Sequence, residues 1–495
     1  MGIAVGRCAH GNANVGSCRP PYDPRAPADV PDLRATPDLA FHGGWLGTIA
    51  PFLLFLGGVS WLGLSGAPDE TGFWPVLLLA LGLGLLLSKD RTRYADAIVD
   101  GMGHRLVMLL ILAWMLAGVL GVLLRDSGLV ASLVWAAGAA GVSGGGFVVA
   151  IFLVCAVFST ATGTSLGTIL ICAPLLYPAA GALGTDAAFA IGAILAGATF
   201  GDNISPISDT TIASATTQGA DLGSVVRSRL RYALPAAAVT LVVFGLFGGS
   251  GSPPSAVSPG AASDSVGLVM LVVPALVLTL LIRGHHLAVG LFAGIGCAVL
   301  LGLPLGRFAL TDLFWIDREN FIASGILLEG MRRSIGVSVF TLLLMGLVGG
   351  VEASGLLTRL IEWVEERAKS EVSAEWWIFG SISAATVLTT HSAVAILTVG
   401  NLARQVGASA GVGPYRRANV LDVAVCTYPF LFPFFIPTIL AASMTIGPPG
   451  LPRISPWDAG LHNVHSWALL GILVIAIATG WGRAEGEADA EVTPG

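Results

Sequence analysis

The sequence predicts an all-helical membrane protein with many transmembrane segments, and three observations lead to this fold class. Only 11% of the 495 residues are charged and 54% are apolar, whereas soluble domains have about 25% charged residues. Apolar runs long enough to cross a bilayer recur along the whole chain. Short motifs from the first half also return in the second half.

The apolar runs are predicted to be helices, because a segment in lipid must satisfy its own backbone hydrogen bonds. The clearest runs are residues 44–64, 106–124, 266–282, 287–303, 337–351 and 467–481. The formal net charge of −6 is small and indicates no nucleic-acid partner. The cysteines have no metal-binding spacing, and no cofactor is predicted.

Self-comparison indicates that the chain is duplicated. Residues 97–102 (AIVDGM) return as 326–331 (ILLEGM), residues 126–129 (DSGL) as 353–356 (ASGL), and residues 162–165 (TGTS) as 389–392 (TTHS). The last two matches have the same spacing of 227 residues (353 − 126 and 389 − 162), which we call the repeat interval. The first match has a spacing of 229 residues (326 − 97). We therefore expect a disordered cytoplasmic tail at 1–42, transmembrane repeats at 43–250 and 266–482, a linker at 251–265 and an acidic tail at 483–495.

The basic residues predict how the two halves lie in the membrane. Basic clusters at 89–105 and 227–231 indicate cytoplasmic ends, and Arg283 places the end of the next helix there too. The first helix of one half then leaves the cytoplasm, whereas the first helix of the other half enters it. This pattern predicts inverted repeats with both termini in the cytoplasm.

Each half contains apolar segments that are interrupted by polar residues. In the first half these interruptions are 160–165 (TATGTS) and 201–211 (GDNISPISDTT), where Pro206 removes a backbone donor. In the second half they are 386–392 and 419–429. Broken helices are tolerated at membrane depth only where they line a cavity or are buried in protein. Their matched positions in two halves predict a transport site.

The residue types in these segments suit a small hard cation, because carboxylates, hydroxyls and carbonyls are oxygen ligands. A carboxylate within the membrane is costly and is a functional candidate. It can bind either a cation or a proton, so competition between them would produce exchange. The candidate ion and proton ligands are Asp202, Asn203, Ser205, Asp209, Thr210 and Asp422, together with Thr162, Thr164, Ser165, Thr389, His391 and Ser392. Asp202 and Asp422 are the predicted metal-ion ligands and charge carriers, although Asp209 could instead be the N-cap of the following helix.

Residues 197–211 (GATFGDNISPISDTT) resemble the signature of NhaC-type sodium/proton antiporters. Residues 160–167 and 417–422 (RANVLD) are similar to further elements of that family, and the similarity extends over about 43–481. The resemblance implies sodium/proton exchange and inverted repeats with re-entrant hairpins. The sequence departs from the family pattern at Asn203, where relatives often have a basic residue, and at 427–429.

We therefore expect a secondary transporter, not an enzyme, that exchanges sodium or lithium for protons in the inner (plasma) membrane. Its predicted partners are these ions and the lipid bilayer, and a homodimer is left open. One alternative is a cation-coupled carrier of a small organic acid or amino acid, which lacks an evident embedded Arg or Lys beside the motifs. A remote alternative is an intramembrane aspartyl protease using Asp202 and Asp422, which the duplication disfavours.

Overall fold

The computed structural model describes residues 39–65, 70–249, 265–283, 285–318, 321–356, 370–446 and 451–483. The predicted tails and linker therefore lie almost wholly outside the described residues. Within these ranges the chain is helical, apart from one antiparallel hairpin of β1 (Trp315–Asp317) and β2 (Ile322–Ser324). Seven of the described helices are long and apolar enough to cross a membrane. The predicted all-α polytopic fold is confirmed.

The described part of the first half is built from α-helices and one short 3-10 turn. The helices are α1 (Trp45–Leu64), α2 (Phe73–Leu87), α3 (Arg91–Met102), α4 (Arg105–Asp126), α5 (Leu129–Ala139), α6 (Gly144–Thr162), α7 (Ser165–Ala182), α8 (Ala187–Ile204), α9 (Asp209–Gln218) and α10 (Leu222–Phe247), and the 3-10 turn is η1 (Glu70–Gly72).

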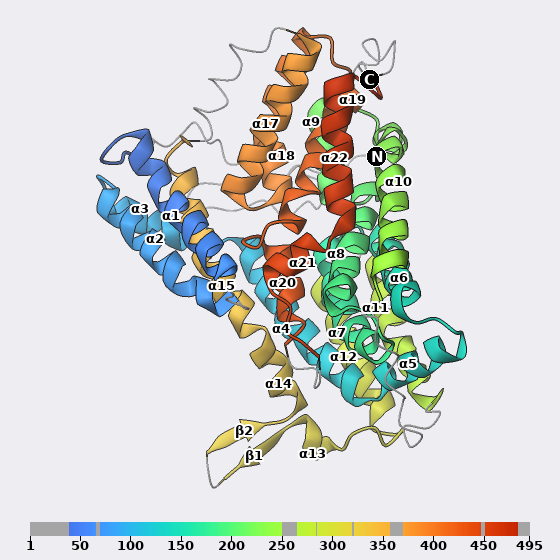
Figure 1. The fold of residues 1–495 in the computed structure, drawn as a ribbon. Coiled ribbons are helices and arrows are strands. Elements are labelled where there is room, and N and C mark those ends of the chain that lie inside the picture. Colours follow the sequence, from blue (N-terminus) through green and yellow to red (C-terminus); the bar gives the residue numbers. More distant parts are fainter. Residues whose placement is uncertain are drawn as a thin grey trace, which may run out of the picture. The chain divides into compact units, whose positions relative to one another are not determined.

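The second half of the chain is coloured from yellow to red in Figure 1. Its described elements are η2 (Ser265–Leu271), α11 (Val272–Ile282), α12 (Leu287–Gly302), α13 (Leu310–Leu313), α14 (Ile326–Arg333), α15 (Ile335–Glu352), α17 (Glu371–Thr389), α18 (Ser392–Ser409), α19 (Pro414–Val425), η3 (Tyr428–Phe430), α20 (Ile436–Ser443), α21 (Pro456–Leu461) and α22 (Val464–Thr479).

The repeat interval found in the sequence returns in the helix boundaries. Helices α17 and α18 begin and end one repeat interval after α6 and α7, and α19 and α20 begin one repeat interval after α8 and α9. The two turns that precede α7 and α18 also share their backbone conformation, with positive φ at Gly163 (65°) and at Thr390 (52°). The inverted orientation of the halves in the membrane stays a prediction.

Glycines of the first repeated motif bring the two halves into close contact. Helix α3 packs against α15, and α14 packs against α4. A Cβ atom on Gly101 would lie 3.1 Å from the Cα of Gly349, and one on Gly118 would lie 2.9 Å from the Ser334 hydroxyl. The backbone of Gly330 also lies directly against Gly118. Such contacts need residues without side chains, so these motifs specify helix crossings.

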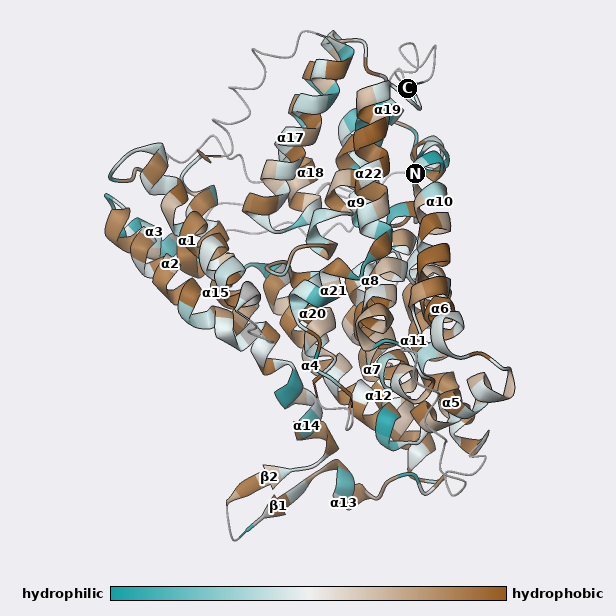
Figure 2. Ribbon diagram, viewed as in Figure 1, coloured by the Kyte–Doolittle hydropathy of each residue, from teal (hydrophilic) through white to brown (hydrophobic). Residues whose placement is uncertain are grey.

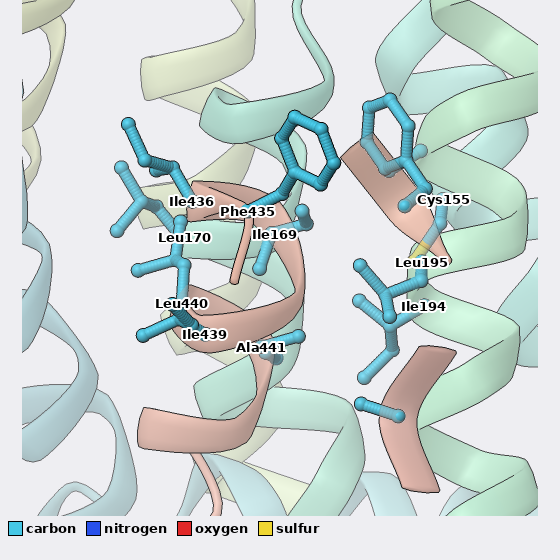
Figure 3. Close-up of a cluster of buried hydrophobic side chains, with 14 of the residues drawn as sticks. Cys155, Ile169, Leu170, Ile194, Leu195, Phe435, Ile436, Ile439, Leu440 and Ala441 are labelled. Atoms are coloured by element: carbon cyan, nitrogen blue, oxygen red, sulfur yellow. The ribbon is translucent and has the colours of Figure 1, made fainter. Parts of the chain in front are cut away.

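The largest hydrophobic cluster also joins the two halves. Figure 3 shows Ile436, Ile439 and Leu440 of α20 beside side chains of α7 and α8, including Leu170 and Ile194. In contrast, α2 and α10 carry exposed leucines, and both ribbons are largely hydrophobic in Figure 2. An apolar core combined with an apolar outer surface is typical of a protein surrounded by lipid.

Candidate functional site

The predicted break in the first half lies between α8 and α9. Helix α8 ends at Ile204, and four residues that include Pro206 precede Asp209 at the start of α9. Asp202 lies in the last turn of α8 and its side chain is 6% exposed. The Ser205 hydroxyl donates to the Thr160 carbonyl at 2.8 Å. This bond holds the break against the end of α6, so the two interrupted segments of the first half do meet.

Two signature glycines bring α8 close to α6. A Cβ atom on Gly197 would lie 2.6 Å from the Cβ of Cys155. A Cβ atom on Gly201, one turn later, would lie 2.5 Å from both the Ala156 carbonyl oxygen and the Ser159 Cβ. These glycines therefore allow a close helix contact directly before Asp202.

Neutral oxygen atoms surround the Asp202 carboxylate. The hydroxyls of Ser165 and Ser208 lie beside it. The Oδ1 atom of Asp202 and both polar side-chain atoms of the buried Asn203 have no hydrogen-bond partner within the described chain. A buried polar atom without a partner costs about 1–3 kcal/mol. A small cation would relieve this cost at the oxygen atoms, so the residues present fit such an ion.

The described ranges contain no group of three or more His, Cys, Asp and Glu side chains that could hold a metal ion. Within these ranges the candidate site instead offers Asp202 as an unpaired carboxylate among neutral oxygen atoms. Divalent cations are usually bound by several carboxylates. Around Asp202 the partners are instead the hydroxyls of Ser165 and Ser208, with the carboxylates of Asp209 and Asp422 in electrostatic range.

Asp422 has a different environment, because it forms an ion pair with Arg229 of α10. Both side chains are completely buried. Arg229 also donates to the Asn203 carbonyl at 2.7 Å and to the Thr211 hydroxyl at 2.8 Å. The site thus joins α8, α9 and α10 of the first half to α19 of the second half. A protease dyad needs two carboxylates that share a proton, and the Asp422–Arg229 pair does not fit that role.

The expectation that no basic residue lies beside the motifs is wrong, because Arg229 does. Its position near the end of an apolar run was interpreted as a membrane-surface charge. Helical spacing is the sequence feature that could have indicated the burial of Arg229. It follows the buried Val225 by four residues and precedes the buried Ala233 by four, so all three lie on one face of α10. Arg416 and Arg417, at the start of α19, are also almost fully buried.

Arg416 and Arg417 tie the start of α19 to neighbouring elements. Arg416 forms a bidentate ion pair with the buried Glu375 of α17, with N···O distances of 3.0 and 2.9 Å. Arg417 donates to the Gln218 side chain at 3.0 Å. These contacts fix the N-terminal end of the helix that carries Asp422.

Helices α6 and α7 form a first helical hairpin, and α17 and α18 form a second one. The helix that follows the turn is capped in the same way in both hairpins. Thr164 caps α7 by accepting from the Gly167 amide at 3.3 Å, and His391 caps α18 by accepting from the Val394 amide at 3.4 Å. Ser392 donates to the Val425 carbonyl at 3.2 Å, so the second hairpin meets the end of α19. Both interrupted segments of each half are therefore in contact.

Several predicted ligands are engaged in backbone hydrogen bonds. Thr162 donates to the Phe158 carbonyl and Thr389 to the Ala385 carbonyl, each at 2.9 Å. The Thr210 hydroxyl lies 3.0 Å from the Ser208 hydroxyl and beside the Asp422 carboxylate. Of the hairpin residues, Ser165 is the one placed beside Asp202.

Asp209 lies at the edge of the site. It is the first residue of α9 and is exposed, and its Oδ1 accepts from the Thr210 amide at 2.8 Å. The N-cap residue is Ser208, so the alternative N-cap role for Asp209 is wrong by one residue. Asp209 interacts electrostatically with both Asp202 and His391, which places all three side chains in one region.

The second half breaks after Asp422, not at it. Helix α19 continues to Val425, and α20 begins at Ile436. One repeat interval after Asp202, the corresponding position is taken by Pro429. The rings of Tyr428, Phe432 and Phe434 stack nearly parallel along this second break, with 5° between the planes of each successive pair. The two breaks match in position but not in chemistry.

Comparison with known proteins finds similarity to sodium/proton antiporters. The sequence model of the Na+/H+ antiporter family matches residues 52–249. The chain is 28% identical over 309 residues to the Na(+)/H(+) antiporter NhaC of Alkalihalophilus pseudofirmus, covering 59% of this chain and 66% of that protein. It is 28% identical over 255 residues to the Na(+)/H(+) antiporter NhaC of Bacillus subtilis, covering 47% of this chain and 53% of that protein.

A third relative is named for a different activity. The chain is 26% identical over 347 residues to the Malate-2H(+)/Na(+)-lactate antiporter of Bacillus subtilis, covering 66% of this chain and 71% of that protein. The chain spans less than two thirds of the length of the two NhaC proteins. The signature around Asp202, the helical membrane fold and these similarities agree. The chain is a multi-pass membrane protein, and it is similar to sodium/proton antiporters of the NhaC type.

Proposed function

We propose that this protein exchanges sodium or lithium ions for protons, with Asp202 as the carboxylate that both ions share. The observation that carries the proposal is the buried Asp202 Oδ1, which has no protein partner among the described residues. Ser165 and Ser208 provide neutral oxygen atoms beside it. A buried carboxylate needs a compensating partner, and here either a cation or a proton can take that place.

Competition for one carboxylate is sufficient to couple the two fluxes. When the cation binds, the proton is expelled, and when the proton binds, the cation leaves. The break between α8 and α9 lies at the surface of the described chain, because Ile207 is 52% exposed and Asp209 is exposed as well. Ser205 holds the break against α6 and would keep the carboxylate in place during exchange.

A cation-coupled carrier of a small organic acid is the second candidate. Arg229 favours it, because a buried guanidinium can grip a carboxylate substrate, and one relative is named as a malate/lactate antiporter. However, Arg229 already contacts Asp422, Asn203 and Thr211. Sodium-driven proton movement that requires added malate or lactate would favour this candidate over simple cation exchange.

The test is sodium-, lithium- or potassium-driven pH change in proteoliposomes containing the purified protein. The Asp202→Asn variant keeps the shape and one oxygen but removes the titrating charge. We expect it to fold and insert, and to lose both exchange and its pH dependence. Asp186→Asn is a matched control on the same helix, because Asp186 caps the other end of α8 and asparagine also caps well. Wild-type exchange by Asp202→Asn would exclude Asp202 as the shared carboxylate.

We further propose that the protein lies in the plasma membrane with both termini in the cytoplasm and with inverted halves. The basic clusters at 89–105 and 227–231 support this topology. Reporter fusions at the two termini test it, and tails on opposite faces of the membrane would exclude it.

A further inference from the structure

We propose that Arg229 is a built-in counter-cation for Asp422, so that only Asp202 changes its bound ion and each cycle exchanges one cation for one proton. This inference rests on the proposed function and assigns a positioning role to Arg229. It also changes the role of Asp422, which the sequence predicted to be a direct metal-ion ligand.

The first support is the completeness of the Arg229 contacts. The guanidinium is fully buried and contacts Asp422, Thr211 and the Asn203 carbonyl. Its Nε donates to the Asn419 side chain at 3.2 Å. A guanidinium stays protonated in proteins. Arg229 therefore supplies one permanent positive charge beside Asp422, whatever ion occupies the site.

The second support is the contrast between the two buried carboxylates. Asp422 has Arg229, the Thr211 hydroxyl at 3.3 Å and the Cys426 thiol at 3.7 Å as partners. Asp202 has neutral hydroxyls beside it, and its Oδ1 has no partner within the described residues. Arg229 therefore offsets the charge of Asp422, whereas Asp202 is left for one monovalent cation or one proton to neutralise.

The other titratable groups near Asp202 do not provide a second site at which a cation and a proton exchange. Asp209 is exposed at the start of α9, at the edge of the site, so it is not a buried charge that needs a bound ion. The His391 Nδ1 accepts the Val394 amide and must be unprotonated to do so. The Cys426 thiol is buried and donates to Asp422. Among the described residues around this position, Asp202 is therefore the carboxylate that must bind either a cation or a proton.

A cycle of charge variants tests the role of Arg229. Asp422→Asn leaves the buried guanidinium unpaired, and Arg229→Gln leaves the buried carboxylate unpaired. Each should lower exchange by about tenfold or more, because the remaining buried charge is strongly unfavourable. The double variant Arg229→Gln/Asp422→Asn restores the charge balance and should recover most of the exchange. Arg227→Gln is the matched control, since Arg227 is exposed two residues away on the same helix.

The double variant separates the two roles of Asp422. If Asp422 bound the transported cation directly, the double variant would be as inactive as Asp422→Asn, and the inference would be overturned. Recovery of exchange with a sodium affinity and pH profile close to wild type supports it.

A second measurement needs no variant of the site. In wild-type proteoliposomes, a potassium diffusion potential set by valinomycin should leave the sodium/proton exchange rate unchanged at either polarity. Acceleration by one polarity means that net charge moves, and it overturns the one-for-one ratio. Failure of the proposed function has a different signature, because sodium would then move no protons at any potential.

Discussion

Replacement of Gly201 by alanine tests whether the close contact of α6 and α8 holds the candidate site together. The added Cβ would lie 2.5 Å from the Ala156 carbonyl oxygen and from the Ser159 Cβ, whereas ordinary contacts are 3.4–4 Å. The helices would have to separate by about 1 Å, which forfeits a quarter to a half of the dispersion energy of the affected contacts. Overpacking of this kind costs about 1–3 kcal/mol, and the better helix propensity of alanine returns up to about 1 kcal/mol.

We therefore expect Gly201→Ala to lower the free energy of unfolding by about 1–2 kcal/mol. Exchange should also fall, because Ser205 and Thr160 would be pulled apart. Gly57→Ala is the matched control, since Gly57 lies inside α1 and a Cβ there would meet nothing within 4 Å. Thermal unfolding of the purified proteins in detergent measures both variants. Equal unfolding temperatures for the two would refute the packing argument.

Three further predictions concern local features. Gly163→Ala should destabilise the first hairpin by about 1–2 kcal/mol because φ there is +65°, whereas Thr390→Gly should not lower the unfolding temperature. Glu375→Ala leaves the buried Arg416 without its charge partner and should cost about 3–5 kcal/mol in chemical unfolding. A backbone amide in the first turn of α10 lowers the pKa of Asp221. Its stabilising effect is therefore present at neutral pH and is lost as pH falls, so the stability difference between wild type and Asp221→Ala should shrink below pH about 4.

Local sequence signals predicted much of the architecture. Glycine, proline and hydroxyl residues in apolar runs indicated where helices break, and the breaks around Asp202 and at the 162–165 turn are found there. The repeat interval came from short motifs, and it holds for helix boundaries because the same motifs cap both hairpins. These features depend on neighbours in the chain, which a sequence displays directly.

The charge arrangement of the site was not predictable in the same way. The partner of Asp422 lies on a helix of the other half, and an arginine near the end of an apolar run is usually a surface charge. Burial of Arg229 depends on polar groups from α8, α9 and α19 that meet only in the folded chain. The correspondence of Asp202 with Pro429 at the repeat interval was also hidden, because here the second half keeps the helix starts but not the polar residues.

Helix α3 packs against α15 and α4 packs against α14, so helices of the first half pack against helices of the second half. This arrangement has a consequence for biogenesis. During synthesis, α3 and α4 are completed long before the helices that cover their glycine faces exist. The first half therefore enters the membrane with bare backbone surfaces at Gly101 and Gly118, which lipid must cover until Gly349 and Gly330 arrive. Neither half can reach its final packing alone. Separately expressed halves should accordingly be degraded, unless both are made in the same membrane and find each other there.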